Sequence, residues 1–208
     1  VIYDSVLTYA AFLRDTEHLA GHLQQVCGVQ PGDRVLLCMQ NSPQWALAFY
    51  AILRAGAVVV PVNPMNRVEE LRHCVTDSGS QVALVAQDLL PQVRPLLTAD
   101  NDGLRHVVVA TYSDHLRVPT DLAVPDFVAA PRQPLSEPGL VAWADAIAQQ
   151  RAPGPLTTGP DDLCAMPYTS GTTGLPKGCM HTHRSVMSTL VGGVRWFGTA
   201  TDAVCLSV

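Results

Sequence analysis

The sequence has few charged residues, and it has no run of basic ones. Of its 208 residues, 15% are charged and the formal net charge is −5, with an isoelectric point of about 5.7. A protein that binds nucleic acid or an anionic membrane surface presents a patch of lysine and arginine to the phosphates. The composition therefore argues against nucleic acid or such a surface as the main partner.

The chain also lacks a paired-cysteine motif and a long apolar run. Its cysteines are scattered, without a C-x-x-C, at Cys27, Cys38, Cys74, Cys164, Cys179 and Cys205. Most lie in apolar stretches, which is typical of reduced core residues in a cytosolic protein rather than of a disulfide framework or a zinc site. No apolar run reaches membrane-span length, and no signal peptide is visible. We therefore expect a cytoplasmic location without an integral membrane segment.

A G-x-S-x-G nucleophile motif is absent as well, which disfavours hydrolase chemistry. An H-x-H pair, His181 and His183, is present, but no third metal ligand lies near it in the sequence. We interpret the pair as part of a helix start or a pocket wall rather than as a metal site. The isolated histidines are interpreted as surface or helix-face residues: His18, His22, His73, His106 and His115.

The sequence does contain enough apolar material for one sizeable core, since 48% of its residues are hydrophobic. Helical spacing predicts helices over 9–26, 43–56, 66–78, 140–149 and 186–197, the third starting with a capping box formed by Asn66 and Glu69. Short apolar runs predict strands over 35–39, 57–62, 82–86, 107–110, 163–167 and 204–208. This alternation implies an α/β fold, with a mostly parallel β-sheet flanked by helices on both faces. Five prolines mark 113–138 as a long surface excursion.

The most informative segment is 168–178, which reads YTSGTTGLPKG. Its hydroxyl groups, its glycine-permitted backbone and its lysine are suited to binding a polyphosphate. It is not a Walker A loop, because Pro176 replaces the second glycine and Gly178 replaces the Mg²⁺-binding serine or threonine. A flexible linker would not need a lysine, a proline and an apolar lead-in at fixed places. We therefore predict a phosphate-binding loop of another kind.

Residues 169–178 match the pattern [ST]-S-G-[ST]-T-G-x-P-K-G without a gap, and this pattern resembles the phosphate-binding loop of the adenylate-forming superfamily. Two upstream segments, 7–13 (LTYAAFL) and 52–64 (ILRAGAVVVPVNP), resemble further family segments in the same order. Residues 64–79 continue as in bacterial medium- and long-chain fatty-acid–CoA ligases. The resemblance spans residues 7–208.

The resemblance implies an enzyme that uses ATP, Mg²⁺ and, as co-substrate, coenzyme A. The residues it implies for ATP binding are Thr169, Ser170, Gly171, Thr172, Thr173, Gly174, Lys177 and Gly178. Lys177 is the expected catalytic residue, because its charge would stabilise the leaving pyrophosphate. Thr169 is the implied Mg²⁺ ligand.

The resemblance covers only the first part of such an enzyme. We expect residues 1–208 to be the N-terminal portion of the large AMP-binding domain, inactive alone, with the small C-terminal domain outside this sequence and the native N-terminus upstream of Val1. The full-length protein would be an AMP-forming acid–thiol ligase whose partners are a carboxylic acid, ATP and CoA. Residues 118–127 resemble fatty-acid ligases and favour a fatty acid. The sequence is compatible with a homodimer. The alternative is a non-catalytic nucleotide-binding or interaction module that kept the phosphate loop.

Overall fold

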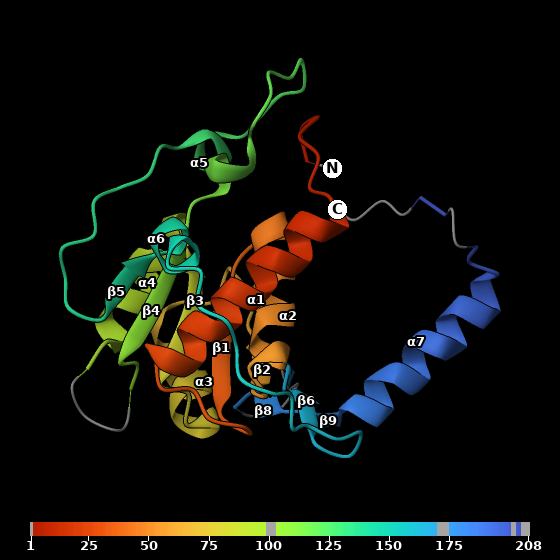
Figure 1. Ribbon diagram of the computed structural model, residues 1–208. Helices are drawn as coiled ribbons and strands as arrows, with labels where there is room; N and C mark the ends of the chain where they lie inside the picture. The colour runs from red at the N-terminus through yellow and green to blue at the C-terminus, as the bar shows by residue number, and fades with distance from the viewer. Residues whose placement is uncertain (1, 99–102, 170–174, 201–202, 205–208) are drawn as a thin grey trace.

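The computed structural model of the chain describes residues 2–98, 103–169, 175–200 and 203–204. Strands and helices alternate along it (Figure 1). The strands are β1 (Arg34–Cys38), β2 (Val58–Pro61), β3 (Val82–Ala86), β4 (His106–Ala110), β5 (Leu140–Ala142), β6 (Leu163–Ala165), β7 (Tyr168–Thr169), β8 (Lys177–Gly178) and β9 (His181–Thr182). The helices are α1 (Tyr9–Gln25), α2 (Pro43–Arg54), α3 (Val68–Ser78), α4 (Leu90–Val93), α5 (Asp126–Ala129), α6 (Trp143–Ala148) and α7 (His183–Phe197), with 3₁₀ turns η1 (Gln87–Leu89), η2 (Arg94–Leu96) and η3 (Tyr112–His115).

The main sheet has seven strands in the order β5-β4-β3-β1-β2-β6-β9. Every neighbouring pair from β5 to β6 is parallel, and only β9 runs antiparallel to its neighbour β6. Parallel neighbours require crossover connections, which explains why helices separate most of the strands along the chain. The predicted α/β class with a mostly parallel sheet is confirmed.

Strand β1 shows how both faces of the sheet are covered. Val35 and Leu37 pack into one core cluster with residues of α1, α2 and α6, whereas Leu36 and Cys38 pack into a second cluster with residues of α3 and α4. All four side chains are at most 1% exposed. Burial on both faces is the reason the strand is continuously apolar in sequence. The predicted covering of both faces is therefore confirmed.

The prediction of a single helix over 140–149 was wrong at its start. Leu140–Ala142 form β5, which pairs in parallel with β4 at the edge of the sheet, with Val141 opposite Val108. Only Trp143–Ala148 are helical. Gly139, at φ +84°, lies just before the strand. Residues other than glycine rarely adopt this backbone conformation. Pairing with β4 thus outweighs the helical spacing of these apolar residues.

Helix α3 begins one residue later than the predicted capping box. Arg67 is the N-cap, and its N–H donates to Glu70 Oε2 at 2.8 Å. Asn66 instead donates its N–H to the carbonyl of Asn63, so Asn66 and Glu69 do not form the box. A turn at 63–66 comes first and shifts the helix start.

Two other expectations changed. His22 lies on a helix, α1, as one of the two interpretations had it, but on its buried face at 1% exposure, and His115 in η3 is buried at 6% exposure rather than on the surface. The strand predicted over 163–167 ends at Ala165. For the strand predicted over 204–208, Val204 is in no strand and 205–208 lie outside the described residues.

The proline-rich segment 113–138 is a surface excursion, as predicted. It contains the end of η3 and all of α5. Buried Gln87 ties it to the sheet: Gln87 Nε2 donates to the carbonyl of Pro131 at 2.9 Å, and the N–H of Gln133 donates to Gln87 Oε1 at 2.7 Å. Among the described residues, no helix is both long and apolar enough to cross a membrane.

Candidate phosphate-binding site

The predicted phosphate loop begins and ends on a two-stranded antiparallel ribbon formed by β7 and β8. Tyr168 pairs with Gly178, and Thr169 pairs with Lys177. Directly opposed residues of such a pair lie on the same face, with their Cα atoms about 4.5–5.5 Å apart. The side chains of Thr169 and Lys177, both exposed, are therefore neighbours at the mouth of the loop that joins them.

One flank of the ribbon is hydrogen-bonded to the main sheet, and its two flanks are hydrogen-bonded to each other. The N–H of Met166 donates to the carbonyl of Val59 in β2, and the N–H of Cys179 donates to the carbonyl of Pro167, each at 2.8 Å. The ribbon thus follows the carboxyl end of β6, next to β2. In open α/β sheets, ligands bind outside the carboxyl ends of the parallel strands. The fold places the ribbon, which carries Thr169 and Lys177 of the motif, where such a sheet offers a site.

Of the eight residues predicted to bind ATP, the structure brings three together on the ribbon: Thr169, Lys177 and Gly178. The other five lie outside the described residues: Ser170, Gly171, Thr172, Thr173 and Gly174. A Cβ on Gly178 would lie 2.9 Å from Met166 Cγ and 3.3 Å from Tyr168 Cζ. Gly178 therefore has a packing reason to be glycine, beside any contact with phosphate.

Two residues that the sequence did not single out for this site lie against the ribbon. His73 Nε2 is 2.7 Å from the carbonyl oxygen of Pro176, and the hydroxyl of Tyr168 donates to Asp77 Oδ2 at 2.6 Å. His73 lies on a helix, in line with its interpretation as a surface or helix-face residue, but the sequence did not indicate that it contacts the ribbon. The available signal was the spacing of His73 and Asp77, four residues apart on α3 and therefore on one helix face.

The H-x-H pair spans the end of the sheet and the start of α7. His181 lies in β9, and His183 opens the helix, where its N–H donates to the carbonyl of Asp162 at 3.1 Å. Thr182 is the N-cap, and its side chain accepts from the N–H of Ser185 at 3.2 Å. These contacts support the interpretation as a helix start. In the part of the chain that the structure describes, no group of three or more histidine, cysteine, aspartate or glutamate residues could hold a metal ion.

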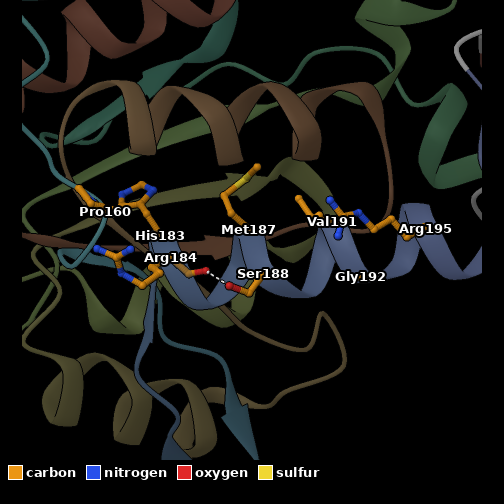
Figure 2. A pocket seen from close by; sticks show the side chains of 8 residues that line it. All are labelled: Pro160, His183, Arg184, Met187, Ser188, Val191, Gly192 and Arg195. Atoms are coloured by element: carbon orange, nitrogen blue, oxygen red, sulfur yellow. Dashed lines mark hydrogen bonds between the residues drawn. The ribbon is translucent and has the colours of Figure 1, made fainter.

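A hollow of about 590 Å³ lies beside α7 (Figure 2). Its lining residues are Pro160, His183, Arg184, Met187, Ser188, Val191, Gly192 and Arg195. None of them is a predicted phosphate-binding residue, and α7 has no buried residue. Arg184, the cation next to His183, forms an exposed ion pair with Asp161. The hollow is therefore separate from the described residues that were predicted to bind phosphate.

The ribbon residues fit a magnesium–polyphosphate ligand by their chemistry. A hydroxyl oxygen, as on Thr169, is a hard ligand of the kind that Mg²⁺ accepts, and Mg²⁺ commonly keeps several waters and binds through substrate phosphates. The ammonium of Lys177 is a compact point charge suited to phosphate. Both groups are exposed where they could meet such a ligand.

Comparison with known proteins identifies the family of the chain. The whole chain, residues 1–208, matches the family described as AMP-binding enzyme. It is 32% identical over 195 residues to a long-chain-fatty-acid–CoA ligase of Escherichia coli O6:H1, covering 89% of this chain and 34% of that protein. It is 29% identical over 182 residues to a benzoate–CoA ligase of Thauera aromatica, covering 88% of this chain and 30% of that protein.

A solved structure of a long-chain-fatty-acid-CoA ligase from Archaeoglobus fulgidus has the same fold, with a TM-score of 0.70 at 23% identity over 93% of this chain and 33% of that one. The chain spans about a third of the length of the curated relatives it matches. The loop motif lies within the matched residues 1–208, and the sheet has the mostly parallel topology that was expected of this family. The chain therefore belongs to the AMP-binding enzyme family.

Proposed function

We propose that the intact protein is an AMP-forming acid–CoA ligase whose substrate is a hydrophobic carboxylic acid, with fatty acids as the favoured class. The observation that carries this proposal is the ribbon, which sets Thr169 opposite Lys177 at the ends of the loop motif. The similarity to fatty-acid–CoA ligases favours fatty acids, and the match to a benzoate–CoA ligase keeps the class as wide as hydrophobic acids.

The composition supports a special role for Lys177. It is the only lysine in the sequence, whereas the other twelve of the thirteen basic residues are arginines. Lysine and arginine are not interchangeable, because the ammonium is a compact point charge and the guanidinium a planar fork. All the remaining basic positions are arginines, and the lysine is the residue that ends the loop, opposite Thr169.

In the proposed reaction, a carboxylate oxygen of the acid attacks the α-phosphorus of ATP, and the bond to pyrophosphate breaks. Lys177 stabilises the negative charge that the departing pyrophosphate gains. The thiolate of CoA then attacks the acyl carbon, and AMP leaves with its bridging oxygen. Bound Mg²⁺ would neutralise phosphate charge, and Thr169 is the residue proposed to hold it.

The remaining loop residues keep their predicted roles within this proposal. Ser170, Thr172 and Thr173 would donate hydroxyl hydrogen bonds to the phosphates, and Gly171 and Gly174 would donate backbone N–H groups. All five lie outside the described residues.

The test is acid-dependent exchange of labelled pyrophosphate into ATP by the intact protein, with a panel of short, medium, long and aromatic acids. We expect exchange with at least one hydrophobic acid. Lys177→Ala should lower its rate by about 10²–10³, the cost of removing one preorganised charge-stabilising group. Lys177→Arg should recover only part of the loss, because the fork does not reproduce the point charge.

No exchange above background with any acid would overturn the proposal. ATP binding without exchange would favour the alternative, a nucleotide-binding module. An alanine variant at position 177 with wild-type turnover at saturating ATP would refute the role of Lys177 alone.

A further inference from the structure

Helix α3 presents His73 and Asp77 to the ribbon from a single face. The two residues are four positions apart, the spacing that puts side chains side by side on a helix. The ring of His73 also packs edge-on against that of Tyr168, with centroids 6.0 Å apart and planes at 82°. The helix therefore meets β7 through Tyr168, and through Pro176 it meets the residue just before β8.

The contact of His73 fixes the backbone next to Lys177. Its Nε2 lies 2.7 Å from the carbonyl oxygen of Pro176. A carbonyl oxygen can only accept, so Nε2 must carry the proton and donate it. This hydrogen bond holds the peptide group that joins Pro176 to Lys177, one residue from the proposed catalytic charge.

The contact of Asp77 fixes the other strand. The Tyr168 hydroxyl donates to Asp77 Oδ2 at 2.6 Å, a short distance typical of a hydrogen bond to an ionised acceptor. Tyr168 directly precedes Thr169, the proposed Mg²⁺ ligand.

The ribbon needs such support because it is short. Each of its strands is two residues long, and an isolated two-stranded ribbon is at best marginally stable in water. Its position therefore depends on what it packs against. Met166 and Tyr168 pack against the core cluster that includes Leu71 and Cys74 of α3, so α3 supplies both apolar and polar contacts.

We propose that His73 and Asp77 are positioning residues, which hold the ribbon against α3 and thereby place Lys177 and Thr169 for the reaction. This inference rests on the proposed function for its consequence, but not for the contact itself. The contacts of both side chains in the structure are with the ribbon and the residue before β8. They act through the peptide before Lys177 and through Tyr168.

The experiment compares His73→Ala and Asp77→Ala with His73→Gln and Asp77→Asn in the intact protein. Glutamine can still donate from a side-chain nitrogen, and asparagine can still accept from Tyr168. We expect each alanine variant to lower the kcat of pyrophosphate exchange about 10-fold to 100-fold, as misplaced catalytic groups do, with KM for the acid unchanged. The glutamine and asparagine variants should recover most of kcat.

Arg72→Ala is the matched control on the same helix, since Arg72 is half-exposed and its ion pair is with Glu69 on α3 itself. It should leave kcat unchanged. A second readout needs no catalysis: amide hydrogen–deuterium exchange at residues 177–179. Exchange there should be faster in both alanine variants and unchanged in Arg72→Ala.

The outcomes separate the two proposals. A wild-type protein that exchanges no pyrophosphate would overturn the proposed function, and the hydrogen–deuterium measurement would then still decide whether α3 holds the ribbon. An active wild type whose alanine variants keep both wild-type kcat and wild-type amide protection would overturn the positioning role. If the glutamine and asparagine variants lost kcat as much as the alanine variants do, the positioning role would also be contradicted. The hydrogen bonds to Pro176 and Tyr168 would then not be what sets kcat.

Discussion

His22 is a fully buried histidine in α1, and its surroundings make the fold sensitive to acid. Burial, the main cause, lowers the pKa of His22, and it likewise lowers the pKa of His106 and His115. The unfolded chain, whose histidines titrate near pH 6.5, therefore binds more protons below neutral pH than the folded chain does. The stability that these residues confer is present above that pH and is lost as the pH falls towards their folded pKa values.

We expect the urea concentration at the unfolding midpoint of the wild-type chain to decrease as the pH is lowered from 7.5 to 5.5. The midpoint of His22→Leu should fall less over the same range, because one of these titrating groups is gone and an apolar side chain takes its place at a buried position. Urea unfolding followed by circular dichroism at several pH values measures both slopes. A variant slope equal to that of the wild type would show that His22 does not contribute to the acid sensitivity.

Among the elements, two helical glycines form a matched pair with opposite surroundings. A Cβ on Gly21 in α1 would lie 2.1 Å from the carbonyl oxygen of Arg151, whereas a Cβ on Gly192 in α7 would meet nothing within 4 Å. Gly21→Ala should destabilise the chain by about 1–3 kcal/mol, the usual cost of overpacking. Gly192→Ala should be neutral or stabilise its helix by up to about 1 kcal/mol.

Denaturant unfolding of the two variants side by side checks this contrast. If Gly21→Ala were as stable as the wild type, the close approach of α1 to the segment after α6 would not exist in solution. If both variants were destabilised alike, the difference in packing between α1 and α7 would be refuted.

The elements also show which parts of the fold a sequence can predict. The strands β1 to β4 are buried on both faces, so their continuous apolar runs identify them locally. Strand β5 could not be identified in this way, because Leu140–Ala142 become a strand only by pairing with β4.

The candidate site likewise has a part that the sequence predicts and a part that it does not. The loop motif is local in sequence, and the structure places its first residue, Thr169, opposite its lysine, Lys177, on one ribbon. The partners of that ribbon are not local. His73 lies 103 residues from Pro176 and Asp77 lies 91 residues from Tyr168, and only the packing of α3 brings them together. Sequence spacing indicated one helix face but not what that face contacts.

For the molecule as a whole, the parallel sheet gathers segments that are distant in the chain at one end of its strands. Helix α3 follows β2, and the ribbon follows β6, which pairs with β2. This adjacency is why a helix from the first half of the chain supports a loop from its end. The proposed phosphate site, with Lys177 as its proposed charge and α3 as its proposed support, thus follows from the order of the strands in the sheet.

The most direct test of this account follows the oxygen atoms of the acid. The intact protein is incubated with ATP, CoA and a hydrophobic acid carrying ¹⁸O in its carboxylate, and the nucleotide product is analysed by mass spectrometry. Attack of the carboxylate on the α-phosphorus predicts that AMP is formed and carries one ¹⁸O atom from the acid. Formation of ADP with ¹⁸O in inorganic phosphate, or of AMP without ¹⁸O, would contradict it.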